Sequence, residues 1–140
     1  MDSYVIGVDI GGTGTKYGIV DKDGNVLHSS SMATNTHEQV HTYIDELYEK
    51  VSELIEKVGG VGRIKGIGVG APNGNIYTGT IEYAPNLPWK GIIPFAKMLQ
   101  DEKLKEQIYL RICETAILQY KNNSNSDEVE VTTDEANESD

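Results

Sequence analysis

The stretch Asp9-Ile10-Gly11-Gly12-Thr13-Gly14-Thr15-Lys16 decides the fold class, because it places a carboxylate and a glycine-rich turn directly after an apolar run. That run, residues 4–8, predicts a buried strand, and ligands of α/β sheets collect at the carboxyl ends of such strands. Glycines have no Cβ, so the backbone can turn tightly and present its N–H groups to an anion. The stretch therefore predicts a site for nucleotide phosphates, formed by Asp9, Gly11, Gly12, Thr13, Thr15 and Lys16.

The residues after the glycines separate this stretch from two better-known phosphate loops. The dinucleotide fingerprint and the P-loop both run from a strand straight into a helix, whereas residues 15–20 here have the pattern of a second strand. Asp23-Gly24-Asn25 then indicates a turn, and residues 26–31 a third strand. Strand, glycine hairpin and strand resemble the phosphate hairpin of sugar kinases and actin-like ATPases. The alternative is an ordinary hairpin in which the glycines only form the turn.

The middle of the chain is predicted to complete one α/β lobe. Thr36 with Gln39 matches a capping box, and apolar residues at three- and four-residue spacing then predict a helix that Gly59-Gly60 ends. Residues 64–69 predict the next strand. The remaining predicted elements are a hairpin of residues 76–77 with 80–83, a helix over 93–99 with Pro94 near its start, a strand over 108–112 and a short helix over 114–120. The order is βββαβ(ββ)αβα, with a mixed sheet.

Composition excludes several classes of protein. The chain has 140 residues, which is the size of a single domain. Its formal net charge is −10, and without a basic stripe nucleic acid is not an expected partner. Cys113 is the only cysteine, so no internal disulfide and no cysteine zinc cluster is expected. Neither a membrane span nor a secretory signal is predicted, and we expect a cytoplasmic protein.

Most of the negative charge lies in residues 121–140. This segment has seven acidic residues against Lys121, and it is rich in Asn, Ser and Thr. With so few large apolar side chains it cannot bury enough surface to offset the entropy of ordering. We therefore expect residues 1–120 to form the lobe and residues 121–140 to be a disordered acidic tail. A docking function of the tail is the alternative.

Two further segments have the composition of ligand-binding loops. Residues 66–74 carry alternating glycines, with Gly70 and Asn73 at the end of a predicted strand. Residues 84–91 place Asn86 between two prolines and add Trp89 as the wall of a pocket. Neutral amides suit sugars because they both donate to and accept from hydroxyl groups. The alternatives are close helix packing for the glycines and a proline-rich turn around a packed tryptophan.

These motifs together resemble the amino-terminal lobe of ROK-family sugar kinases, and within them the bacterial ATP-dependent glucokinases. The motifs are residues 9–16, residues 68–73 and residues 84–89, and the resemblance covers about residues 4–100. It implies an actin-like, ribonuclease-H-like fold in which ATP and sugar meet between two lobes. It further implies that residues 9–16 bind the phosphates of ATP, that Asp9 lies near Mg²⁺, and that Gly70, Asn73 and Asn86 contact glucose or a related hexose. Family repressors carry a helix-turn-helix before the first strand, so that function is not expected here.

The resemblance weakens after about residue 99. In the family the next strand ends in an Asn-Asp pair, whose Asp is the expected base for the sugar hydroxyl. Here Ile112-Cys113 stand at that point, and Glu114 is one residue further along. The base matters for phosphoryl transfer, so no catalytic residue is assigned and Glu114 is only a substitute candidate. The alternative for Glu114 is an exposed residue in a first helical turn, where a negative charge suits the dipole.

The family's second phosphate loop, its zinc site and the Glu that holds the sugar have no counterpart in these residues. His37 and His41 are one helical turn apart, but without a third ligand we interpret them as a solvated helix face and expect no zinc site. Completed by a second lobe, the site would transfer the γ-phosphoryl of Mg-ATP to the 6-hydroxyl of glucose. The chain alone is expected to be inactive and to self-associate or be marginally stable. The alternatives are a non-catalytic binding module, or a truncated product without independent function.

Overall fold

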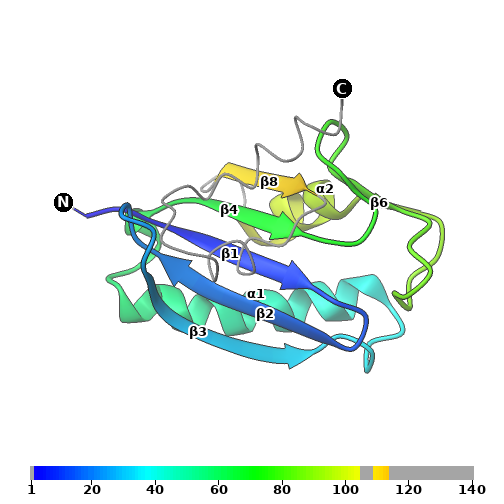
Figure 1. Cartoon of the computed structure of the whole chain (residues 1–140), viewed down its shortest axis with the longest axis horizontal. Coiled ribbons are helices and arrows are strands. Elements are labelled where there is room, and N and C mark those ends of the chain that lie inside the picture. Colours follow the sequence, from blue (N-terminus) through cyan, green and yellow to red (C-terminus); the bar gives the residue numbers. More distant parts are fainter. Residues whose placement is uncertain (1, 105–108, 114–140) are drawn as a thin grey trace.

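The computed structural model describes residues 2–104 and 109–113, and a five-stranded mixed sheet forms its centre (Figure 1). The strand order is β3-β2-β1-β4-β8, with β1, β2 and β3 antiparallel and with β4 and β8 parallel to β1. The predicted mixed α/β sheet is therefore confirmed. The bounds of the strands are β1 (Tyr4–Ile10), β2 (Gly14–Val20), β3 (Val26–Ala33), β4 (Ile64–Gly70) and β8 (Tyr109–Cys113).

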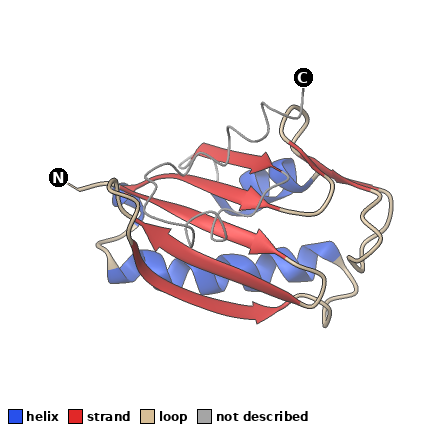
Figure 2. Ribbon diagram, in the orientation of Figure 1, coloured by secondary structure: helices blue, strands red, loops and turns tan. Residues whose placement is uncertain are grey.

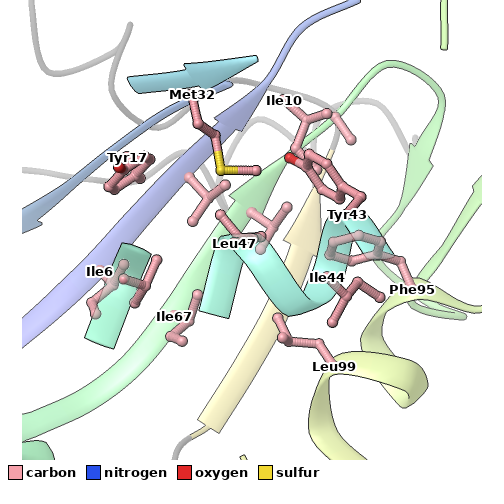
Figure 3. Packing of buried hydrophobic residues seen from close by; sticks show 14 of the residues in the cluster. Ile6, Ile10, Tyr17, Met32, Tyr43, Ile44, Leu47, Ile67, Phe95 and Leu99 are labelled. Atoms are coloured by element: carbon pink, nitrogen blue, oxygen red, sulfur yellow. The ribbon is translucent and has the colours of Figure 1, made fainter. Parts of the chain in front are cut away.

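Helix α1 (Val40–Lys57) packs against one face of this sheet and builds the core with it (Figure 2). Because side chains alternate along a strand, Ile6, Val8 and Ile10 of β1 share the face that contacts α1, and each is at most 2% exposed. The apolar stripe of α1 faces them, which is the usual arrangement for an amphipathic helix on a sheet. Figure 3 shows how strand and helix side chains interdigitate, among them Ile6, Tyr17, Met32, Tyr43, Ile44, Leu47 and Ile67.

A small second sheet lies between β4 and the next helix in the chain. Its order is β5-β6-β7, and all its pairs are antiparallel. Phe95 and Leu99 of the following helix α2 are buried in the same core as α1. The bounds of these elements are β5 (Gly74–Asn75), β6 (Thr80–Glu82), β7 (Ile92–Ile93), α2 (Phe95–Leu99), the π-helical turn η2 (Gln100–Leu104) and, before β4, the 3₁₀ turn η1 (Val61–Arg63).

The start of α1 differs from the prediction. The residue before the helix is Gln39, whose side chain makes no capping hydrogen bond, so the predicted capping box with Thr36 is wrong. The segment ahead of it is held elsewhere: Thr34 N–H donates to Thr13 O, and His37 N–H donates to Thr34 O. That turn fixes the path of the chain, and the helix begins after it. The predicted end is correct, since Gly60 N–H donates to Ile55 O with a φ of 100°.

The hairpin predicted over residues 76–83 begins earlier than expected. Asn75 Oδ1 accepts hydrogen bonds from Tyr77 N–H and Thr78 N–H, and Gly79 N–H donates to Asn75 O. Residues 76–79 are thereby a turn rather than a strand, because the asparagine side chain competes for backbone donors. Ile93 belongs to β7, where it pairs with Ile81, and not to the predicted helix.

Two predicted segments lie outside the described residues, namely the helix over 114–120 and the acidic tail over 121–140. The strand predicted over 108–112 is found at 109–113. Among the helices of the described part of the chain, none has the length and apolar character that crossing a membrane requires.

Candidate functional site

The glycine turn joins β1 to β2 and forms one end of the sheet. Gly11 N–H donates to Gly14 O at 2.9 Å and closes the turn, while Thr13 is exposed at its tip. Asp9 and Lys16 are direct partners in the two strands, so their side chains share one face of the sheet. This is the face opposite α1, because Asp9 alternates with the buried Val8 and Ile10. A carboxylate, an ammonium group and a glycine turn therefore lie together, as predicted.

The Asp9 carboxyl is half-buried, and this burial raises its pKa above the ordinary value, while Lys16 acts in the opposite direction. Desolvation penalises the charged form of a carboxyl group. An additional cation beside Asp9 would therefore offset the desolvation cost of the charged carboxylate. Mg²⁺ bound to a nucleotide commonly uses one or two carboxylates and completes its shell with phosphates and water, and a single carboxylate beside the predicted phosphate turn fits that mode.

Thr15 does not contribute a hydroxyl to the turn surface, in contrast to the prediction. Its side chain is fully buried on the α1 side of β2, and its Oγ1 lies 2.7 Å from Thr34 Oγ1 and 2.7 Å from Tyr43 Oη. The alternation of the strand turns this residue inward while Lys16 turns outward. The Thr15 hydroxyl therefore stabilises the hairpin from the core side and does not face a ligand.

Gly70 lies beside Asp9, at the end of the neighbouring strand. It pairs with Asp9 on one side and with Cys113 on the other, so residues 9, 70 and 113 form one row across β1, β4 and β8. Gly70 is buried and has no side chain that could contact the Asp9 carboxylate. The row also places the backbone of residue 113 at the same end of the sheet as the glycine turn. Glu114, the substitute candidate for a base, lies outside the described residues.

Asn73 has two tasks in its loop. Its backbone has a left-handed φ of 59°, and its Nδ2 donates to Glu82 O at 2.9 Å and to Tyr83 O at 3.2 Å. Tyr83 also has a left-handed φ, of 53°. Such non-glycine residues are uncommon and often mark functional loops. The amide donor of Asn73 therefore fixes the end of β6, and its Oδ1 accepts no hydrogen bond within the part of the chain that is described.

Asn86 reaches the glycine turn directly. A Cβ placed on Gly12 would lie 2.6 Å from Asn86 O and 3.3 Å from Asn86 Cβ, so the two backbones touch where only glycine fits. Leu87 and Trp89 anchor the loop in the core and leave Asn86 exposed. The structure thus brings together the predicted phosphate turn and one predicted sugar contact, which are more than 70 residues apart in the sequence.

His37 is not part of a solvated helix face, in contrast to the expectation from the sequence. Its Nε2 lies 2.6 Å from Glu46 Oε1, its Nδ1 lies 3.1 Å from Thr42 Oγ1, and its backbone carbonyl accepts a hydrogen bond from Trp89 Nε1. His41 is exposed. No three His, Cys, Asp or Glu side chains cluster as metal ligands in residues 2–104 and 109–113.

Sequence reasoning missed the buried groups that support the turn. The pattern predicts Tyr43 only as an apolar position of the helix, and it assigns no role to Thr34. No local pattern could have found them, because both hydroxyl groups bond to Thr15 of β2 and the ring of Tyr43 packs against Trp89. A hollow lined by Asp2, Tyr4, Lys22 and Leu27, among others, lies at the opposite end of β1 and β2 and has no part in this site.

Comparison with known proteins supports the resemblance. Residues 5–118 match the model of the ROK family. Glucokinases of Streptomyces coelicolor and Streptomyces lividans are each 30% identical over 108 residues, which is 76% of this chain and 29% of theirs. The chain thus spans about 29% of the length of the curated relatives it matches.

Solved structures share the fold. A ROK family glucokinase from Streptomyces griseus, in complex with glucose and AMPPNP, superposes with a TM-score of 0.69 and 23% identity, over 89% of this chain and 38% of that one. A ROK hexokinase from Thermus thermophilus gives a TM-score of 0.60 and 24% identity, over 78% and 35%. The chain accordingly has the actin-like, ribonuclease-H-like fold of sugar kinases.

Proposed function

The chain belongs to the ROK family, and we propose that its glycine turn and its Asn86 loop form one half of a sugar-kinase site. The observation that carries this proposal is the contact between Gly12 and Asn86. The contact brings the glycine turn next to the Asn86 amide, and this supports a site in which phosphate binds at the turn and a sugar hydroxyl binds at the amide, as phosphoryl transfer to a sugar requires.

In this proposal the turn at residues 11–14 binds the phosphates of ATP through its backbone N–H groups. Lys16, near the start of β2, adds a positive charge on the same face of the sheet as Asp9. Asp9 would lie near the Mg²⁺ of the nucleotide and contact it indirectly, and that ion would neutralise charge on the phosphates during transfer. Thr13, exposed at the tip of the turn, adds a hydroxyl donor.

The hexose binds on the other side of the contact. Asn86 offers its amide from a loop that two prolines and two buried anchors hold, and Asn73 offers its Oδ1 as an acceptor. Gly70, the strand partner of Asp9, would contact the sugar through its backbone. When a second lobe completes the site and excludes water, the product would be glucose phosphorylated at its 6-hydroxyl.

We propose that the chain by itself is inactive, because the position of the expected catalytic base is occupied by another residue type. Residue 113 ends β8 in the same row as Asp9 and Gly70, and this is where the resemblance implies the Asp of an Asn-Asp pair. Cys113 stands there instead. A thiol is a poor replacement for a carboxylate as the base for a hydroxyl group, because proton transfer depends on a matched pKa and on position. A non-catalytic binding module is therefore the second candidate, and a truncated product without independent function the third.

Calorimetry with glucose and with Mg-AMPPNP, alongside an ADP-release assay, distinguishes these candidates. The expected result is weak binding of both ligands without turnover. Asn86→Ala should weaken glucose binding and leave Mg-AMPPNP binding unchanged, while Lys16→Ala should do the reverse. Leu27→Ala is a surface control, because its exposed side chain lies on β3 at the end of the sheet away from the glycine turn. Turnover would make Glu114 the first residue to replace, and the absence of both binding events would support the truncated product.

A further inference from the structure

Tyr43 is buried between the two loops of the proposed site. It lies in the first turn of α1, its side chain is 0% exposed, and its N–H donates to Gln39 O. Figure 3 shows its ring close to Phe95 and its hydroxyl directed toward the strand that ends in Ile10. The hydroxyl group of a buried tyrosine usually has a hydrogen-bond partner.

The hydroxyl group of Tyr43 serves the glycine hairpin. It hydrogen-bonds with Thr15 Oγ1 at 2.7 Å, and Thr15 Oγ1 lies 2.7 Å from Thr34 Oγ1. Thr34 N–H in turn donates to Thr13 O, at the tip of the turn, at 3.0 Å. The chain of bonds thus runs from α1 through β2 to the residue at the outermost point of the phosphate turn.

The ring of Tyr43 serves the Asn86 loop. Its centroid is 4.6 Å from that of Trp89 and 5.8 Å from that of His37, which is in the range of stabilising aromatic pairs. Trp89 is 4% exposed and donates to His37 O, so the loop cannot move without moving the indole. The same loop touches Gly12 through Asn86.

We propose that Tyr43 is a positioning residue that couples the glycine hairpin to the Asn86 loop, so that a ligand at one loop orders the other. The proposal rests on the proposed function for the identity of the two ligands. Its physical basis is that one rigid side chain carries two different contacts, a hydrogen bond to the hairpin and ring packing to the loop. Movement of the hairpin therefore shifts the ring against which Trp89 packs.

Amide hydrogen exchange on the full chain tests this without any ligand. Gly11 N–H bonds to Gly14 O in the hairpin, and Leu87 N–H bonds to Ala84 O in the loop, so both amides are protected reporters. In Tyr43→Phe both should exchange roughly fivefold faster, the factor expected for one lost buried hydrogen bond. The amide of Gly60, which bonds to Ile55 O at the far end of α1, should not change, because its local opening leaves the Tyr43 hydrogen bond intact.

Tyr17→Phe is the matched control. Tyr17 is also a buried tyrosine, at 3% exposure on the neighbouring β2, and its phenol makes no hydrogen bond in the described part of the chain. It should leave the exchange of Gly11 and Leu87 at the wild-type rate. Equal acceleration at Gly60 would mean that exchange reports only a general loss of stability, and an unchanged Leu87 in Tyr43→Phe would mean that the two loops are not coupled. Either result overturns the proposal. If Tyr43→Phe does not fold, Thr15→Val removes the same hydrogen bond from the other side and is read by the same criteria.

A second measurement uses Trp89, the single tryptophan of the chain. Mg-AMPPNP should change its emission in the wild type and in Tyr17→Phe. In Tyr43→Phe the ligand should still bind by calorimetry, with a smaller change in emission. An equal change in emission in the wild type and Tyr43→Phe would contradict the coupling. If no AMPPNP binds to the wild type, the proposed function of the chain fails, whereas the exchange of Gly11 and Leu87 still decides whether Tyr43 couples the loops.

Discussion

An alanine at position 12 would place its Cβ inside the loop that carries Asn86. The Cβ would be 2.6 Å from Asn86 O, closer than such atoms approach in proteins, and the obstructing atom is backbone that cannot rotate away. Leu87 and Trp89 anchor that loop in the core. The strain must therefore be relieved by displacing either the turn or the loop, at a cost of about 1–3 kcal/mol, as for other overpacked sites.

Gly14→Ala supplies the matched comparison in the same turn. Its Cβ would be 3.6 Å from Met32 O, an ordinary contact, and neither glycine has a left-handed φ. Both variants gain about 0.4–1 kcal/mol because alanine restricts the unfolded chain. That gain cancels between them, so their difference in unfolding free energy isolates the clash, and we expect it to be about 2 kcal/mol.

Urea unfolding followed by Trp89 fluorescence measures this difference. With a urea dependence of about 2 kcal/mol per molar, the midpoint of Gly12→Ala should lie about 1 M below that of Gly14→Ala. Gly12→Ala should also weaken glucose binding, because the displaced loop carries Asn86. Equal midpoints for the two variants would show that the Asn86 loop does not rest on the turn, and they would remove the observation on which the proposed function depends.

Three further expectations concern other parts of the chain. Asp9→Asn should raise stability at pH 7 and have little effect below pH 3.8, the ordinary pKa of an aspartate side chain. The raised pKa of Asp9 means that the folded state holds this proton more tightly than the unfolded state, so stability falls as pH rises through the folded-state pKa; urea midpoints at both pH values check this, and a gain independent of pH would contradict it. Thr34→Val should cost about 1 kcal/mol, because a buried hydroxyl partner of Thr15 is lost, and an unchanged urea midpoint would argue against the hydrogen-bond chain. Ile92, which is 54% exposed, should promote self-association, so Ile92→Thr should lower the sedimentation coefficient at high concentration, and a monomeric wild type would refute this.

Much of the fold follows from the sequence pattern. The local signals were the apolar run of β1, the strand pattern of β2, and the three- and four-residue spacing of α1 with the glycines after it. These three elements lie close to their predicted bounds. The local pattern predicted the wrong structure in two places. In one a side chain accepted hydrogen bonds from the backbone, and in the other a segment distant in the sequence bonded to the chain. The hydrogen bonds of Asn75 stabilise a turn where a strand was predicted. The backbone hydrogen bonds of Thr34 fix the segment before α1, and the helix begins after the predicted capping box.

The sequence by itself determined the residue types of the site: a carboxylate, a glycine turn, a lysine and two asparagines, each at the end of a predicted strand or in a predicted loop. Only the tertiary structure decided how they meet. It packed Asn86 against Gly12, turned the Thr15 hydroxyl into the core, and placed Tyr43 between the hairpin and Trp89. The physical reason is that strand and helix periods are set by neighbouring residues, whereas contacts between distant segments are set by which surfaces pack together when the whole core is buried.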